Sequence, residues 1–279
     1  MTNGIILIDK PINYTSRDIV NIVSKKLKTK QIGHTGTLDP LATGVLVLTV
    51  GTATKISELL VANKKEYIAT MIFGLSTDTL DITGNILSDY DCIIDIDKIL
   101  SMLNSFKKTY MQEVPIYSAV KVNGKKLYEY ARNNIDVVLP KKEVSIYDIS
   151  LVDYKIENNK TVVKFKCLVS KGTYIRSLIR DLASSINENA TMSALVRTKQ
   201  GIFDINEADK IDSEYNIIPI SEVLKDYYTV ILDDNIKPKV LNGCKIKNIY
   251  NKDYVLFKGD NLFLYKDFDG VLKPYKMFL

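Results

Sequence analysis

The segment GHTGTLDPLATG, residues 33–44, combines three glycines, three threonines, one proline, one aspartate and the only histidine of the chain. Glycines let a backbone approach a ligand closely, and Pro40 disfavours helical geometry at Asp39. We therefore interpret the segment as a rigid loop from which the carboxylate of Asp39 projects. Such a carboxylate can serve as a nucleophile or as an acid–base group. The alternative is an aspartate that only hydrogen-bonds a turn.

Three other chemistries fit this loop less well. A phosphate-binding P-loop ends in Gly-Lys-Ser/Thr, which the loop lacks. A hydrolytic triad could use His34, but the chain contains no G-x-S-x-G segment. A metal site needs more carboxylates than this loop has, or several imidazoles, and the chain has a single histidine. We therefore expect neither metal nor cofactor, and a lone carboxylate whose partners come from elsewhere in the chain.

Regular elements are expected on both sides of the loop. A helix capped by Ser16 should run to about Lys28, and a second should follow Gly172-Thr173, with Ile175, Leu178 and Ile179 on one face. Residues 97–106 are also predicted to be helical. Strands are expected at residues 4–10, 45–51, 67–73 and 161–169. Since strands and helices do not alternate regularly, the pattern favours an α+β fold with a largely antiparallel sheet.

Two further segments differ from this pattern. Residues 111–145 are polar, basic and weakly periodic, which is typical of a functional loop or an insertion. From about residue 230 the chain consists of short β-like runs separated by Asn-Gly, Gly-Asp-Asn and Asp-Gly turns. We therefore predict two domains, residues 1–229 and a small all-β domain at residues 230–279.

Two side chains are candidate partners for Asp39. Arg176 is placed just inside the predicted helix, where a cation opposes the helix dipole, so a nearby anion would explain its position. An exposed arginine is the alternative. Tyr67 stands at the start of a predicted strand, where a tyrosine is more often part of the core than of a site.

Charge and hydropathy limit the protein class. The net charge of +5 over 279 residues fits a polyanionic partner without requiring one. No apolar run reaches the roughly 18–20 residues needed to cross a bilayer, and the N-terminus lacks the features of a signal peptide. We expect a cytoplasmic protein that does not enter a membrane.

Taken together, these segments resemble the TruB family of tRNA pseudouridine synthases. The resemblance covers about residues 4–201, through GIILIDKPINYTS, GHTGTLDPLATGVLVLTVGTATK, KEYIATMIFGLSTDTLDITG, PIYSAVKVNGKKLYEYAR, VSKGTYIRSLIRDLA and LVRTKQG. It implies a mixed, mostly antiparallel sheet flanked by helices, with the active site in a cleft across the sheet. It also implies an RNA-clasping insertion at about residues 111–145 and a small PUA-like domain at the C-terminus.

The resemblance also implies roles for individual residues. Asp39 matches the family's catalytic nucleophile, and Arg176 matches the arginine paired with it. The remaining matches are substrate-binding residues: His34, which helps to hold the target nucleotide out of its stack, Tyr67, which packs on the target base, the pocket residues Tyr174 and Leu195, and the basic residue Lys10.

The implied activity is isomerisation of uridine to pseudouridine at position 55, in the T arm of tRNA, by a monomer that needs no protein partner or cofactor. One alternative is a non-catalytic tRNA-binding protein that helps tRNA to fold, which would have no need of Asp39, Arg176 and Tyr67 together. A second is a synthase guided by a separate RNA within a protein complex. A third is a small-molecule enzyme that binds phosphate through the glycine-rich loop, which no nucleotide motif supports.

Overall fold

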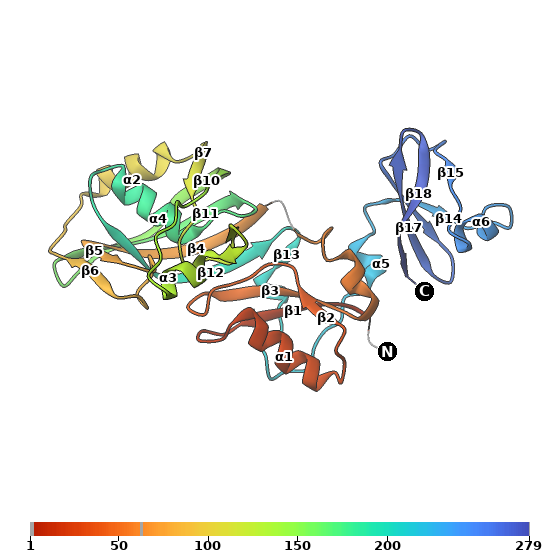
Figure 1. The fold of residues 1–279 in the computed structure, drawn as a ribbon, viewed down its shortest axis with the longest axis horizontal. Coiled ribbons are helices and arrows are strands. Elements are labelled where there is room, and N and C mark those ends of the chain that lie inside the picture. Colours follow the sequence, from red (N-terminus) through yellow and green to blue (C-terminus); the bar gives the residue numbers. More distant parts are fainter. Residues whose placement is uncertain (1–2, 62–63, 279) are drawn as a thin grey trace.

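The larger of two main sheets contains nine strands in the computed structural model, which describes residues 3–61 and 64–278 (Figure 1). Seven strands follow the order β1-β3-β12-β4-β11-β10-β7, while β2 pairs with β3 and β13 with β12. The strands are β1 (Gly4–Lys10), β2 (Ile32–His34), β3 (Thr43–Val50), β4 (Lys64–Phe73), β7 (Thr109–Glu113), β10 (Lys141–Glu157), β11 (Lys160–Ser170), β12 (Ala190–Gln200) and β13 (Phe203–Asp204).

All neighbouring pairs in this sheet are antiparallel except β12 and β3. This parallel pairing consists of Val196 opposite Thr43 and Arg197 opposite Gly44. Gly44 has a φ of 102°, and a Cβ there would collide with the backbone of Arg197. The predicted mixed, mostly antiparallel sheet of an α+β fold is confirmed, and its one parallel contact depends on a glycine from the aspartate-bearing loop.

Three helices pack on the large sheet. They are α1 (Ser16–Lys26), α2 (Ile96–Ser105) and α4 (Ile175–Ser184). In α4 the apolar residues predicted to share a face, Ile175, Leu178 and Ile179, are buried among side chains of β4, β11 and β12. Ile19, Val20 and Val23 of α1 form a separate apolar cluster with alternate residues of β1 and β3. None of the helices in the described ranges is long and apolar enough to span a membrane.

The start of α1 differs from the prediction. Thr15, not Ser16, is the capping residue: its Oγ1 accepts a hydrogen bond from the backbone N–H of Asp18 at 3.1 Å, and Asp18 Oδ2 accepts one from the N–H of Thr15 at 2.8 Å. Ser16 lies inside the helix, and its Oγ accepts a hydrogen bond from the backbone N–H of Leu38 at 2.8 Å. Ser16 therefore ties the helix to the loop residue beside Asp39.

Replacing Thr15 by alanine is expected to lower the free energy of unfolding by about 1 kcal/mol, because one N–H in the first turn of α1 loses its acceptor. Urea denaturation followed by circular dichroism would measure the change. Thr15→Ser keeps the hydroxyl and should retain most of the stability. Equal loss in both variants would mean that the methyl group, not the cap, is responsible.

The segment predicted to be an irregular insertion is more ordered than expected. Its ends are strands of the large sheet, because Lys141–Ser145 of β10 pair with Thr109–Glu113 of β7. Between them lie the short strands β8 (Lys121–Val122) and β9 (Lys125–Lys126) and the helix α3 (Leu127–Arg132). The excursion away from the sheet is thus residues 114–140, and the boundaries predicted from composition, 111–145, are too wide.

The C-terminal part of the chain forms the second main sheet, which lies beside the first in Figure 1. Its order is β14-β16-β17-β18-β15, with β14 parallel to β16 and the other pairs antiparallel. The predicted all-β character is wrong in one respect, because a short helix, α6, follows β14. The elements are β14 (Tyr228–Ile231), α6 (Lys237–Leu241), β15 (Ile246–Lys247), β16 (Tyr254–Lys258), β17 (Leu262–Phe268) and β18 (Val271–Phe278).

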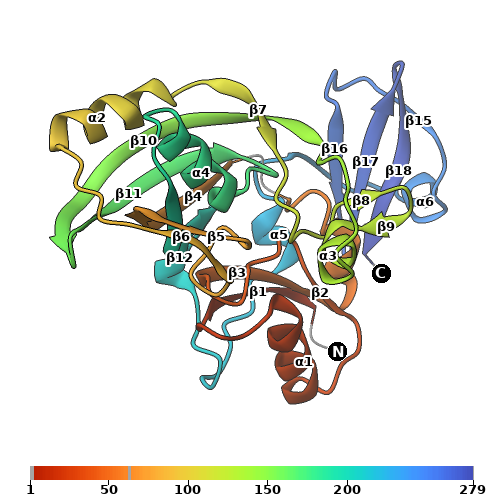
Figure 2. The ribbon, with the colours of Figure 1, turned by 60° about the vertical axis from the view of Figure 1, so that its left-hand side comes forward.

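Short elements complete the fold. A 3-10 turn, η1 (Gly51–Ile56), joins the two sheets: Ala53 and Ile56 pack in one apolar cluster with Leu256, Leu264 and Phe278. The others are β5 (Leu75–Thr77), β6 (Ile86–Asp89), η2 (Ile205–Glu207) and α5 (Ile220–Val223). The turned view shows the long strand β10 arching above α4 (Figure 2).

Candidate active site

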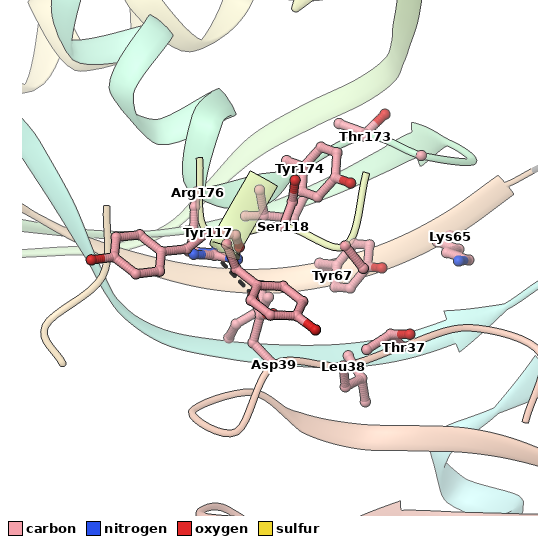
Figure 3. A pocket seen from close by; sticks show the side chains of 15 residues that line it. Thr37, Leu38, Asp39, Lys65, Tyr67, Tyr117, Ser118, Thr173, Tyr174 and Arg176 are labelled. Atoms are coloured by element: carbon pink, nitrogen blue, oxygen red, sulfur yellow. Dashed lines mark hydrogen bonds and ion pairs between the residues drawn. The ribbon is translucent and has the colours of Figure 1, made fainter. Parts of the chain in front are cut away.

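A cavity of about 440 Å³ lies where the aspartate-bearing loop meets the large sheet (Figure 3). It is enclosed by the loop, strands β4 and β12, the start of α4 with the turn before it, the segment before β8, and helix α3. The lining residues are Thr37, Leu38, Asp39, Lys65, Tyr67, Tyr117, Ser118, Ala119, Tyr128, Gly172, Thr173, Tyr174, Ile175, Arg176 and Leu195. Five of the seven residues predicted to form the site are therefore brought to one cavity.

Asp39 and Arg176 form an ion pair at one end of this cavity. Arg176 Nε lies 3.0 Å from Asp39 Oδ2. The N–H direction does not meet the angle of a hydrogen bond, so the contact is electrostatic rather than a well-aligned hydrogen bond. The side chain of Asp39 is 37% exposed, whereas that of Arg176 is only 6% exposed. The carboxylate is thus open to a ligand while its cationic partner is held in the protein.

The guanidinium of Arg176 is held from three directions. Nη1 donates to the backbone carbonyl of Thr79 at 2.9 Å, and Nη2 donates to that of Tyr117 at 3.1 Å. The carboxylate of Asp81, which is buried, lies 3.7 Å from Nη1. Because Tyr117 belongs to the excursion at residues 114–140, this arginine connects the excursion to the aspartate-bearing loop.

Tyr67 and Leu195 form part of the cavity wall from neighbouring strands, β4 and β12. Burial raises the pKa of the Tyr67 hydroxyl, so this group stays protonated at neutral pH. Figure 3 shows its ring between the Asp39 and Lys65 ends of the cavity. An apolar wall with a neutral hydroxyl is suited to a flat, uncharged ring.

Tyr174 caps the start of α4 and is held through its backbone. Its N–H donates to Gln112 Oε1 at 2.8 Å, and its carbonyl accepts from Gln112 Nε2 at 3.1 Å. Gln112 is a buried residue of β7. This double contact sets the entry into the helix that carries Arg176, two residues further on. Burial raises the pKa of the Tyr174 hydroxyl as well.

Lys10 and His34 are not among the residues that line the cavity. The side chain of Lys10 is fully buried, and its Nζ donates to the carbonyls of Pro11 at 2.9 Å, Tyr14 at 2.7 Å and Pro40 at 3.3 Å. It therefore supports the loop next to Asp39, and its contact with substrate stays a prediction. Burial lowers the pKa of Lys10 to about 8, against the opposing effect of Asp39.

His34 ends β2, at the outer edge of the same loop, and is half buried. Burial, followed by the positive charges of Arg197 and Arg17, lowers its pKa, so the imidazole is neutral at pH 7. Its Nδ1 has no hydrogen-bond partner within the part of the chain that the structure describes. Its approach to a nucleotide stays a prediction.

Comparison with known proteins identifies the family. Residues 24–175 match the sequence model described as TruB family pseudouridylate synthase, N-terminal domain. The chain belongs to the TruB family. Curated relatives named tRNA pseudouridine synthase B include the protein of Caldicellulosiruptor saccharolyticus, 45% identical over 86% of this chain and 82% of that protein. The Bacillus subtilis protein of the same name is 41% identical over 88% of this chain and 84% of that protein.

The fold has solved counterparts as well. A chain of the crystal structure titled "a Cbf5-Nop10-Gar1 Complex" superposes with a TM-score of 0.72 over 100% of this chain and 85% of that chain, at 24% identity. A chain of an H/ACA RNP bound to a substrate RNA gives 0.71 at 23% identity, over 99% of this chain and 85% of that chain. At these identities the likeness concerns the fold, and it agrees with the α+β architecture expected of a TruB family member.

Sequence reasoning missed three residues that shape this TruB family site: Asp81, Gln112 and Arg197. Arg197 is fully buried on β12, and its guanidinium donates to the carbonyls of Val45 at 2.8 Å, Gly36 at 3.1 Å and Thr37 at 3.4 Å. Asp81 and Arg197 lie inside the sequence blocks that carry the family resemblance, whereas Gln112 lies between two of these blocks. The scarcity of arginine, five against 33 lysines, was the one signal that could have singled out Arg197.

Proposed function

We propose that this chain converts uridine to pseudouridine at position 55 in the T loop of tRNA, with Asp39 as the nucleophile. The observation that carries the proposal is the ion pair of Asp39 with the buried Arg176, at one end of a cavity in a TruB family chain. The relatives' printed name, tRNA pseudouridine synthase B, supplies the substrate class.

The reaction breaks the bond between ribose C1′ and uracil N1 and forms one between C1′ and C5. The C5 proton is lost and N1 gains one, so the reaction needs no oxidant, reductant or group donor. Asp39 is placed to add to the substrate and to leave again, and the guanidinium of Arg176 beside it favours the ionised form of the carboxylate.

The target nucleotide must leave its stack to reach Asp39. Unstacking costs a few kcal/mol, which a pocket offering stacking and hydrogen-bonding groups can offset. Tyr67, Tyr174 and Leu195 offer such a surface in the cavity, and the excursion at residues 114–140 supplies Tyr117, Ser118 and Tyr128 from the opposite side. We infer that the excursion contributes to holding the T arm, and we propose that the chain acts on tRNA as a monomer.

Single-turnover assay of the wild-type enzyme on an unmodified tRNA transcript tests this function. We expect pseudouridine at the T-loop uridine and no conversion of a transcript in which that uridine is replaced by cytidine. Tight binding of tRNA without any product would instead favour the rival function, a non-catalytic tRNA-binding protein, to which the net charge of +5 is equally suited.

A further inference from the structure

Lys65 lies at the end of the cavity opposite the Asp39–Arg176 pair (Figure 3). It precedes Tyr67 by two residues on β4, so both side chains point to the same face of the strand. The ammonium group approaches the loop backbone closely: a Cβ added to Gly36 would be 3.0 Å from Lys65 Nζ. The cavity is therefore bounded by a carboxylate at one end and by a half-buried ammonium group at the other.

The ammonium group of Lys65 has no ionic partner within residues 3–61 and 64–278. No carboxylate lies within 4.0 Å of its Nζ, and Asp39 is paired with Arg176 at the far end of the cavity. The charged groups that act on Lys65 are the cations Arg197 on β12 and Lys142 on β10, while His34 on β2 and Tyr67 on the same face of β4 are neutral. The positive charge of Arg197 adds to that of Lys65, because the groups that accept hydrogen bonds from Arg197 are uncharged.

This arrangement is costly for the free protein. A cation removed from water without a counter-charge is destabilised, and the penalty is met by a shift toward the neutral form. Burial, and then Arg197 and Lys142, lower the pKa of Lys65 to about 8. An anion at this end of the cavity would remove the penalty, whereas an apolar or cationic ligand would increase it.

We propose that Lys65 binds a backbone phosphate adjacent to the target nucleotide of the RNA substrate. This inference rests on the proposed function and adds a subsite to it. A nucleotide whose base lies against Tyr67 and whose ribose reaches Asp39 carries a phosphate on each side of that ribose. Lysine suits such a contact, since its compact charge can approach a phosphate oxygen from several directions. Thr37, which lines the same end, adds a hydroxyl donor.

The proposal is tested by pairing a lysine substitution with removal of one phosphate charge. The substrate is a T-arm stem-loop RNA, either unmodified or with a neutral methylphosphonate on the 5′ or the 3′ side of the target uridine. Dissociation constants are measured by filter binding for the wild type, Lys65→Gln and Lys65→Arg. Lys155→Gln is the matched control, because Lys155 is an exposed lysine paired with Glu157 near the distant end of β10.

For the wild type, we expect one of the two methylphosphonates to weaken binding by about tenfold, as for loss of one charge-assisted contact. The same substitution should have little further effect in Lys65→Gln, whose binding to unmodified RNA is already weakened to a similar extent. Its affinity should also depend less on salt, with the slope of log K against log salt reduced by about 0.7 to 0.9. Lys65→Arg should behave like the wild type, and Lys155→Gln should show neither change.

If Lys65→Gln and each methylphosphonate weakened binding independently, so that their effects on the dissociation constant multiplied, the proposal would be overturned. Lys65 would then have a packing role. Equal losses in Lys65→Gln and Lys65→Arg would have the same meaning. The wild-type measurements with methylphosphonate RNA need no variant that could misfold. Absence of pseudouridine formation by the wild type would contradict the proposed function, and the binding cycle would still report on the phosphate contact.

Discussion

Replacing Asp39 by asparagine is expected to abolish pseudouridine formation while tRNA binding persists. The amide has nearly the same shape as the carboxylate but cannot act as a nucleophile, so we expect the single-turnover rate to fall by at least about 10⁴-fold. The side chain is 37% exposed and Arg176 keeps its other contacts, so the fold should be retained. Quench-flow measurement with saturating enzyme and an unmodified transcript gives the rate, and filter binding gives the affinity.

The matched control is Asp97→Asn, which removes one negative charge from the exposed first turn of α2. It separates loss of charge in general from loss of charge at the cavity, and its rate should equal that of the wild type. If Asp39→Asn converted uridine at a rate close to that of the wild type, Asp39 would not be the nucleophile. Loss of both binding and turnover would point to a role of Asp39 in the shape of the loop.

Replacing Arg176 by alanine should damage both stability and turnover. Asp81 would then be buried without its cationic neighbour, and two carbonyls would lose their donors, which together cost about 3–5 kcal/mol of unfolding free energy. Asp39 would lose the cation beside it, and we expect the single-turnover rate to fall by about 10²–10⁴-fold. The measurement must be made well below the melting temperature of the variant, so that the folded enzyme is compared.

Two further variants separate these effects. Arg176→Lys keeps a positive charge but not the planar fork that reaches Thr79, Tyr117 and Asp39 together, so it should recover part of the stability and little of the rate. Arg180→Ala, one turn further along α4, removes a guanidinium that pairs with Glu113 and Asp181 outside the cavity lining. Its rate should be that of the wild type. A wild-type rate in Arg176→Ala would exclude the proposed pairing from catalysis.

Many of the strands and helices could be predicted from local sequence patterns. The apolar run at residues 4–10 and the alternation at residues 161–169 predicted β1 and β11, because strands buried on one or both faces carry these patterns. The spacing of Ile175, Leu178 and Ile179 predicted α4. The Asp-Gly pair at residues 269–270 predicted the hairpin between β17 and β18, where both residues have positive φ.

What the sequence did not show depends on contacts between distant segments. The choice between Thr15 and Ser16 as the cap could not be made locally, since Ser16 is used by Leu38, 22 residues away. The ends of the excursion could not be predicted because they are set by the pairing of β7 with β10, two strands that the excursion separates in sequence. Arg197 and Gln112 were missed because they bind backbone atoms of remote segments. Every residue has these atoms, so the sequence does not indicate which of them will be bound.

The partners of the buried cations in this site have an evolutionary consequence. Lys10 donates to three backbone carbonyls, Arg197 donates to three others, and two of the groups that hold Arg176 are carbonyls as well. A carbonyl is present whatever side chain its residue carries. An accepting residue whose side chain has no other contact in the site, such as the exposed Tyr14, can therefore change while the donor cannot, and a mutational scan of this enzyme should find the cations more sensitive than such acceptors.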